Sequence, residues 1–220
     1  MFGFVDEEAL SERRAPRLHV HWAQAASRAR SRGMSGHESR FARTAWGPVA
    51  LSLPTGSIEV AVHETRKAFQ REVEFVLPGV PLAGDEKEGS GAGLLLAIST
   101  MQQARFDLVQ VGDDIEQEKD RLLETFMAFA RELCEKLIAK GHFADYIDPC
   151  SGLPMLTKDA NKVFSEVDSA EQLLGYGVMN AGCCKVLLHP AWGSAVYPAT
   201  VFTTAPVADV TAELSKLQAN

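Results

Sequence analysis

The clearest hydrophobic pattern in the chain runs from Ile115 to Lys140, where large apolar residues recur three or four positions apart. Such spacing places one continuous apolar face along a helix. Lys136 and Lys140 lie near the end of the pattern and Gly141 follows, which favours a helix stop there. The pattern therefore predicts a long amphipathic helix over residues 115–140, with its apolar face formed by Leu122, Phe126, Phe129, Leu133 and Leu137.

The remaining apolar segments are shorter, which favours strands. Residues 94–100 form a run suited to a strand buried on both sides, and residues 106–111 alternate between two faces, so the two could pair as a hairpin. A weak alternation covers residues 58–62, and a second helix is predicted over residues 207–217. Further strands are predicted over residues 143–147, 173–179, 183–189 and 195–203, with a polar connection between the first two of them.

Helices interleaved with strands in this way predict an α+β sandwich, with a mixed or antiparallel sheet flanked by helices. We expect one principal domain over residues 46–220 and an arm over residues 1–45. Residues 13–44 of the arm hold eight arginines against one acid, Glu38, a composition typical of mitochondrial transit peptides. Four acidic residues come before it, so a loosely attached basic arm is the favoured alternative.

Composition narrows the classes of function. No apolar stretch approaches the roughly 18 residues of a membrane span, and a net charge of −7 argues against a nucleic-acid partner. The four cysteines lack the spacing of a secreted disulfide scaffold or of a zinc site, so we expect reduced thiols and no structural metal. Nucleotide-binding signatures are missing as well.

The adjacent pair Cys183 and Cys184 is the strongest candidate for chemistry. Strand alternation places Cys184 with the apolar core set and Cys183 on the opposite face with Lys185, whose charge would favour a thiolate. Gly182 would let a bulky ligand approach the backbone closely. Adjacent Cα atoms are about 3.8 Å apart, too close for an ordinary disulfide, so one thiolate acting as ligand or nucleophile remains. The structural alternative is two small apolar residues in a strand.

Other polar residues have a structural alternative beside the functional one. Asp145 and Asp148 could be paired carboxylates, although capping of a turn over residues 148–152 is the favoured role. Cys134 lies beside the helical stripe and is expected to be an inert core thiol. His189 has no acid or serine at a recognisable spacing, so we predict no catalytic triad.

Taken in order and spacing, several short segments resemble the C-terminal domain of the CblD family, the methylmalonic aciduria and homocystinuria type D proteins. The resemblance is strongest over residues 143–205 and extends loosely back to Phe69. The segments are Tyr146-Ile147-Asp148-Pro149-Cys150-Ser151-Gly152, Leu174-Gly175-Tyr176, Gly182-Cys183-Cys184-Lys185-Val186, His189, Trp192-Gly193 and Phe202-Thr203.

This resemblance implies a nitroreductase-like fold without a bound flavin and without catalysis of its own. It also implies cobalamin that is shared with a CblC-like processing protein and directed toward methionine synthase and methylmalonyl-CoA mutase. The first cysteine of the family motif is the cobalt ligand, which assigns that role to Cys183, with Lys185 stabilising the thiolate. We expect the partner to dock on the segment from Glu166 to Gly182, through Glu166, Asp168, Gly175, Tyr176 and Gly182.

Two departures from the family pattern matter. The family usually has serine where Cys150 stands, and the N-terminal region looks shorter, which leaves the mitochondrial route in doubt. We therefore expect a cytoplasmic location, with a mitochondrial one open. The alternative functions are a flavin-dependent, nitroreductase-like oxidoreductase on the same scaffold and a thiol oxidoreductase.

Overall fold

The computed structural model describes residues 38–82, 94–182 and 184–219. All of these residues belong to one compact unit. Its centre is a five-stranded antiparallel sheet with the strand order β1-β2-β3-β7-β4. The strands are β1 (Ala42–Leu53), β2 (Gly56–Thr65), β3 (Leu96–Gln103), β7 (Val196–Thr203) and β4 (Ala144–Tyr146).

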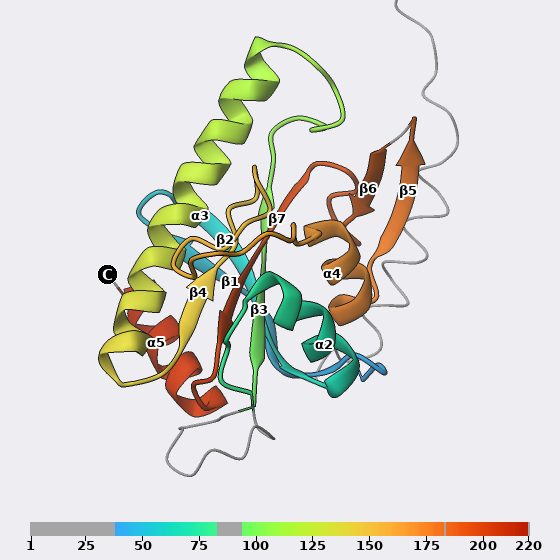
Figure 1. Cartoon of the computed structure of the whole chain (residues 1–220). Coiled ribbons are helices and arrows are strands. Elements are labelled where there is room, and N and C mark those ends of the chain that lie inside the picture. Colours follow the sequence, from blue (N-terminus) through green and yellow to red (C-terminus); the bar gives the residue numbers. More distant parts are fainter. Residues whose placement is uncertain (1–37, 83–93, 183, 220) are drawn as a thin grey trace, which may run out of the picture. The chain divides into compact units, whose positions relative to one another are not determined.

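Helices cover both faces of this sheet (Figure 1). One face packs against α3 (Asp113–Ala139) and α5 (Val207–Ala219), and the other against α2 (Lys67–Val76) and α4 (Glu166–Leu174). A separate hairpin of β5 (Gly177–Ala181) and β6 (Cys184–Leu188) lies beside α4. Among the described residues, no helix combines the length and apolar content that crossing a lipid bilayer requires.

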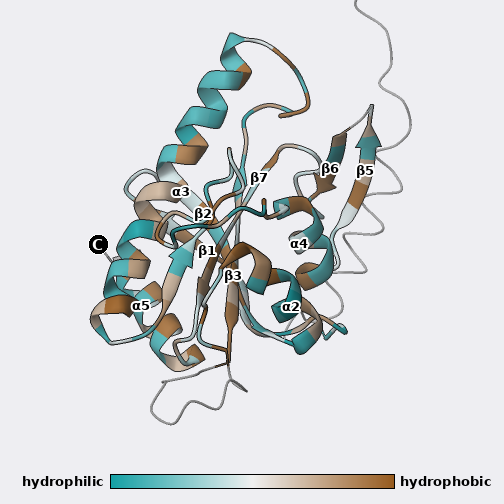
Figure 2. Ribbon diagram, in the orientation of Figure 1, coloured by the Kyte–Doolittle hydropathy of each residue, from teal (hydrophilic) through white to brown (hydrophobic). Residues whose placement is uncertain are grey.

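Strand alternation explains the two-sided core. In β2, Val60 packs against the layer of α3 and α5, whereas the next residue, Ala61, joins the cluster on the side of α4. In β3, Ile98 and Ala97 divide in the same way. Figure 2 accordingly shows apolar colour in β3, while the first turns of α3, which extend beyond the sheet, are mostly hydrophilic.

The structure confirms the α+β prediction and the long amphipathic helix, which is α3. The strands predicted over residues 94–100, 143–147 and 195–203 correspond to β3, β4 and β7, and the second predicted helix to α5. The weakly alternating segment 58–62 lies within β2. Of the segment 183–189, β6 covers Cys184–Leu188, and position 183 lies outside the described residues.

The strand predicted over residues 106–111 is wrong. This segment forms turns, in which the side chain and the carbonyl of Asp107 accept the N–H groups of Val109 and Gln110. Val111 is 96% exposed. Alternation alone misled the prediction, because no neighbouring strand is placed to pair with this segment.

The strand predicted over residues 173–179 is wrong in its first half, and the polar connection before it is a helix. Leu173 and Leu174 end α4, Gly175 follows in the left-handed conformation with φ 67°, and β5 starts at Gly177. The Ser165 side chain accepts the N–H of Asp168 at the start of α4. Serine three residues before an acid and glycine after the last turn are helix signals in the sequence.

Two further elements were missed, α2 and most of β1. The β1 strand begins inside the range assigned to the arm, and a register shift interrupts its pairing with β2 around Gly47 and Pro48. A Cβ atom at Gly47 would lie 2.4 Å from the carbonyl oxygen of Val60, so glycine is required there. This irregular stretch hides the alternation of β1.

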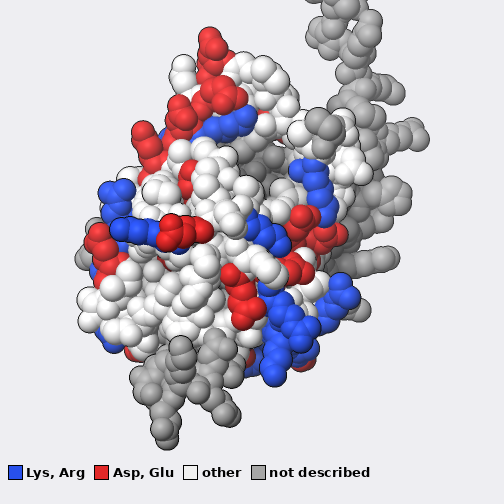
Figure 3. Space-filling view, viewed as in Figure 1, with Lys and Arg blue, Asp and Glu red and all other residues white. Residues whose placement is uncertain are grey.

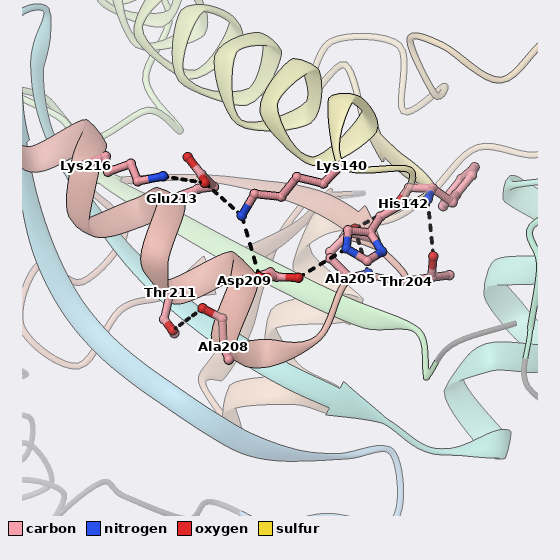
Figure 4. A network of polar contacts seen from close by, with 11 residues as sticks. Lys140, His142, Thr204, Ala205, Ala208, Asp209, Thr211, Glu213 and Lys216 are labelled. Carbon is pink, nitrogen blue, oxygen red and sulfur yellow. Dashed lines mark hydrogen bonds and ion pairs between the residues drawn. The ribbon is translucent and has the colours of Figure 1, made fainter. Parts of the chain in front are cut away.

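Ion pairs join the end of α3 to α5 (Figure 4). Lys140 lies 2.9 Å from Glu213 and 3.6 Å from Asp209, and Lys216 also contacts Glu213. The two lysines lower the pKa of Glu213 to about 2. His142 extends the network to Asp209 at 3.2 Å. These contacts fix the edge of the α3 and α5 layer, on the opposite face of the sheet from α4.

Candidate functional site

The segment with the adjacent cysteines lies where the β5 and β6 strands join. Ala181 pairs with Cys184 across the hairpin, and Gly182 begins the connection between them with φ 63°. A glycine at the first position of a two-residue connection is the usual solution for a tight hairpin turn. Cys183, the predicted cobalt ligand, lies outside the described residues. Its immediate neighbours Gly182 and Cys184 therefore define the site.

The prediction that Cys184 packs in the core is wrong, because Cys184 is exposed. Burial along β6 increases steadily from its start, so that Cys184 and Lys185 are exposed while Leu187 and Leu188 are buried. The turn end of the hairpin lies away from the core, whereas its base, where Gly177 pairs with Leu188, is packed. Exposure along β6 is therefore decided by the distance from the base and not by strand alternation. Burial therefore does not single out one sulfur of the pair.

Lys185 is held by two carboxylates of α4. Its Nζ atom lies 2.6 Å from Asp168 Oδ1 and 2.6 Å from Glu171 Oε2. Hydrogen bonds to these two groups raise the pKa of Lys185, and the same contact with Lys185 lowers the pKa of Asp168. The lysine thus joins the hairpin to α4, and its positive charge is balanced locally. Its predicted role toward the Cys183 thiolate stays a prediction.

The base of the hairpin is attached to the sheet by a buried polar cluster. His189 Nε2 lies 3.1 Å from Glu59 Oε1, and the Tyr176 hydroxyl donates to the same oxygen at 3.3 Å. Burial and the nearby Glu59 carboxylate raise the pKa of Tyr176. Trp192 stacks on the His189 ring with centroids 3.8 Å apart. The acid that the sequence did not reveal for His189 is Glu59, which is 130 residues away.

Replacing Glu59 with alanine is expected to loosen the hairpin. The Tyr176 hydroxyl and His189 would lose their shared acceptor, which costs about 1–3 kcal/mol of unfolding free energy. Hydrogen exchange measured by mass spectrometry should then show faster exchange in residues 177–188 than in β7. Glu64→Ala is the matched control, because Glu64 lies on the same strand and pairs with Arg43 at the surface. Equal hairpin protection in both variants would contradict this attachment.

The structure brings together only part of the predicted partner surface. Asp168 lies on α4 beside the hairpin, and Gly175 is exposed between α4 and β5. Tyr176 is buried in the polar cluster, with 5% exposure. Glu166 turns its carboxyl group inward, where Oε2 accepts a hydrogen bond of 2.5 Å from the Thr200 hydroxyl. Gly182 is exposed at the turn.

The remaining thiols and carboxylates have structural surroundings. Cys134 is buried in the core, as predicted, and burial raises its pKa. Asp148 accepts the N–H groups of Cys150 and Ser151, so its predicted turn-capping role is confirmed. Asp145 is fully buried and does not cap this turn, because its carboxyl group accepts N–H groups of residues 155–157 instead. Cys150 is exposed and contacts Tyr197, whose pKa is raised by burial and then by this thiol.

Two pockets adjoin Lys185. One, of about 400 Å³, lies beside β6 and includes Cys184 and Tyr197 in its wall. The other, of about 360 Å³, lies between α2 and α4 and includes Ser169 and Glu72. Lys185 lines both pockets, so both adjoin the turn end of the hairpin. Among the described residues, no group of three acidic, histidine or cysteine side chains is arranged to hold a metal ion.

Comparison with known proteins shows similarity to one family over most of the chain. A family model described as "Methylmalonic aciduria and homocystinuria type D protein" matches residues 22–218. The cobalamin trafficking protein CblD of Homo sapiens is 32% identical over 148 residues, which is 67% of this chain and 47% of the relative. The CblD proteins of Rattus norvegicus, with 32% identity, and Gallus gallus, with 30%, have the same coverage. The chain thus aligns with about half the length of these relatives.

Proposed function

This chain belongs to the methylmalonic aciduria and homocystinuria type D protein family, and from this membership we propose that it is a cobalamin-trafficking adaptor. In this proposal it binds a CblC-like processing protein and accepts or directs its cobalamin toward methionine synthase and methylmalonyl-CoA mutase. The Cys183 thiolate binds the cobalt, a soft pairing of ligand and metal. A nitroreductase-like scaffold without flavin and a cytoplasmic location, with a mitochondrial one open, are parts of the same proposal.

The observation that carries the proposal is the place of the family motif in the fold. Gly182, Cys184 and Lys185 lie at the exposed turn end of the β5 and β6 hairpin, whose base is packed on the sheet. This end of the hairpin is exposed, while its base is fixed to the sheet. Such an arrangement suits a thiolate that must reach a metal held by another protein. The relatives are named for trafficking and not for catalysis, which fits a chain that is not an enzyme. The same names give no support to a flavin-dependent oxidoreductase.

Pocket size supports sharing of the cobalamin between two proteins. The pocket beside Cys184 measures about 400 Å³, within the range of roughly 300–1,000 Å³ that encloses drug-sized ligands. Cobalamin is considerably larger than such ligands. The described part of the chain could therefore cover one side of the molecule, while a partner holds the rest.

Cysteine variants test the proposal through the absorption spectrum of cobalt. Mixing the chain with a cobalamin-loaded CblC-like protein is expected to change that spectrum, because a thiolate replaces another ligand. Cys183→Ala should abolish the change, and Cys184→Ala should retain it. The second variant is an informative control, since Cys184 is exposed and adjacent in sequence. If Cys184→Ala alone removed the change, the wrong sulfur would have been assigned.

A pull-down separates binding from ligation. The chain should retain the CblC-like protein in the presence of cobalamin, and Cys183→Ala should still retain it, although more weakly. No retention by the unmodified chain would contradict the adaptor role. Retention without any spectral change would preserve the adaptor role and contradict the thiolate ligand.

A further inference from the structure

The pocket between α2 and α4 has an apolar interior. Phe69, Val73 and Val76 of α2 form one wall, and Phe164 closes part of the other. At about 360 Å³ it lies near the lower end of the range for small-ligand pockets. A single large apolar side chain from another protein, inserted from the surface, would therefore fill much of it.

Ser169 gives this pocket a polar group without a partner. The residue is 3% exposed and lines the pocket, yet its Oγ atom has no hydrogen-bond partner among the described residues. A buried hydroxyl of this kind is normally paired with protein or water. The Ser169 Oγ atom is itself buried, so a bound group would reach the hydroxyl only by inserting deep into the pocket. The pocket thus offers one directed hydrogen bond inside apolar walls.

The rim of the pocket holds three acidic residues, Glu72, Asp168 and Glu171, against two lysines, an excess of one negative charge that favours a positively charged group. Lys185 is already held by Asp168 and Glu171, and Lys162 lies over the Phe75 ring at 4.9 Å. Glu72 accepts a long hydrogen bond of 3.4 Å from the amide of Gln172. Figure 3 shows acidic and basic side chains next to one another over α4 and the hairpin. Residues 1–37 contain six of the 22 Lys and Arg and four of the 29 Asp and Glu. The rest of the chain therefore has a net charge of −9.

We propose that this pocket docks the cobalamin-carrying partner protein by taking one of its apolar side chains. A backbone carbonyl beside that side chain accepts the Ser169 hydroxyl, and a neighbouring lysine or arginine of the partner pairs with Glu72. The inference rests on the proposed function, because the partner is the one named there. Lys185 lines the pocket and follows Cys184 in β6, so docking here places the partner next to the cysteine motif.

Charge reversal on α2 tests the docking. Glu72→Lys is expected to weaken binding of the cobalamin-loaded CblC-like protein about tenfold at low salt, and by less at high salt. Glu74→Lys is the matched control, because Glu74 is exposed on the same helix and does not line the pocket. Its dissociation constant, measured by calorimetry, should stay within about twofold of the unmodified chain. Equal weakening by both variants would overturn the proposal, since only general charge would then matter.

Ser169→Ala tests the hydrogen bond without disturbing the fold. Within the described part of the chain the hydroxyl has no hydrogen-bond partner, so thermal unfolding should be unchanged, while binding should weaken about three- to tenfold. If the unmodified chain binds and changes the cobalt spectrum but Glu72→Lys and Ser169→Ala bind equally well, the pocket is not the docking site and the proposed function survives. If the chain alone forms dimers that Glu72→Lys dissociates, a second copy occupies the pocket and the proposal is wrong.

Discussion

Replacing Glu166 with glutamine is expected to stabilise the folded chain by about 2–5 kcal/mol at pH 9 and to change its stability little at pH 4.5. The reason lies in the position of this carboxyl group, at the first residue of α4 and turned toward β7. Burial raises the pKa of Glu166 to about 8, although the hydrogen bonds from Thr200 act in the opposite direction. The folded chain therefore holds this carboxyl group largely protonated at neutral pH.

The geometry explains why the neutral form is favoured. Oε2 accepts the Thr200 hydroxyl, but Oε1 is buried and has no hydrogen-bond partner among the described residues. A carboxylate at the start of a helix gains about 0.3–1 kcal/mol from the helix dipole. Loss of water from a charged oxygen without a partner costs more than that gain. Desolvation therefore outweighs the dipole at this position.

The direction of the pH dependence follows from proton release. Between the ordinary pKa of about 4.5 and the folded pKa of about 8, the unfolded chain has released the Glu166 proton while the folded chain retains it. Stability must then fall as the pH rises through this window and level off above it. Glutamine cannot ionise, so the variant lacks this loss. The gain is smaller than the full pKa difference implies if water reaches the group.

Urea unfolding at pH 4.5, 7 and 9 measures the effect. The difference between Glu166→Gln and the unmodified chain should grow with pH, because only the unmodified chain contains the ionisable group. Glu124→Gln on the exposed side of α3 is the control, and its difference should stay near zero. A Glu166→Gln difference that is the same at all three pH values would show that the carboxyl group is ionised in the folded chain.

The elements that could be predicted from sequence are those whose pattern has one structural solution. The stripe of α3 is long and broad enough to exclude a strand, and the apolar run of β3 is covered on both faces. The segment 106–111 has strand alternation but no pairing partner, so its local signal was misleading. The short α4 was missed because Leu173 and Leu174 resemble the start of a strand, although Ser165 and Gly175 mark both helix ends.

Of the candidate site, only the sequence motif could be predicted, and its contacts could not. Cys184 and Lys185 could be named from the sequence, but the exposure of Cys184 depends on how far the hairpin extends from its packed base. The pairing of His189 with Glu59 could not be predicted, because 130 residues separate them and only the fold brings them together. The carboxylates that hold Lys185 lie in a helix that was expected to be a connection. Contacts of this kind are properties of packing, which a local pattern does not contain.

Replacing Asp145 with alanine is expected to lower the free energy of unfolding by about 3–5 kcal/mol. Asp145 is fully buried in β4 and its carboxyl group accepts a hydrogen bond from the N–H of the following residue. The same group also holds a distant loop, because it accepts the N–H groups of Met155, Leu156 and Thr157 at 3.2, 2.9 and 2.7 Å. Alanine would leave the N–H groups of Leu156 and Thr157 without this acceptor, while the N–H of Met155 also donates to the Tyr146 carbonyl at 2.9 Å.

The size of the effect follows from the number of donors and from their access to water. Each hydrogen bond to a charged group contributes roughly 1.5–3 kcal/mol. Met155 and Leu156 are 43% and 47% exposed, so water can replace part of the loss in the loop. About 3–5 kcal/mol remains, a large fraction of the 5–15 kcal/mol that typically stabilises a domain. The loop leads toward Ser165 and α4, so its release should also loosen the helix that holds Lys185.

Two variants make this expectation specific. Asp145→Asn retains one acceptor oxygen in nearly the same volume, so urea unfolding should show about half the loss seen with alanine. Asp148→Ala removes an exposed capping group from the neighbouring turn, where it accepts the N–H groups of Cys150 and Ser151, and should cost only about 1 kcal/mol. Hydrogen exchange should rise over residues 155–157 in Asp145→Ala and stay low there in Asp148→Ala. If Asp145→Ala cost no more than Asp148→Ala, the buried carboxylate would not hold the loop, and the placement of α4 would depend on its apolar contacts alone.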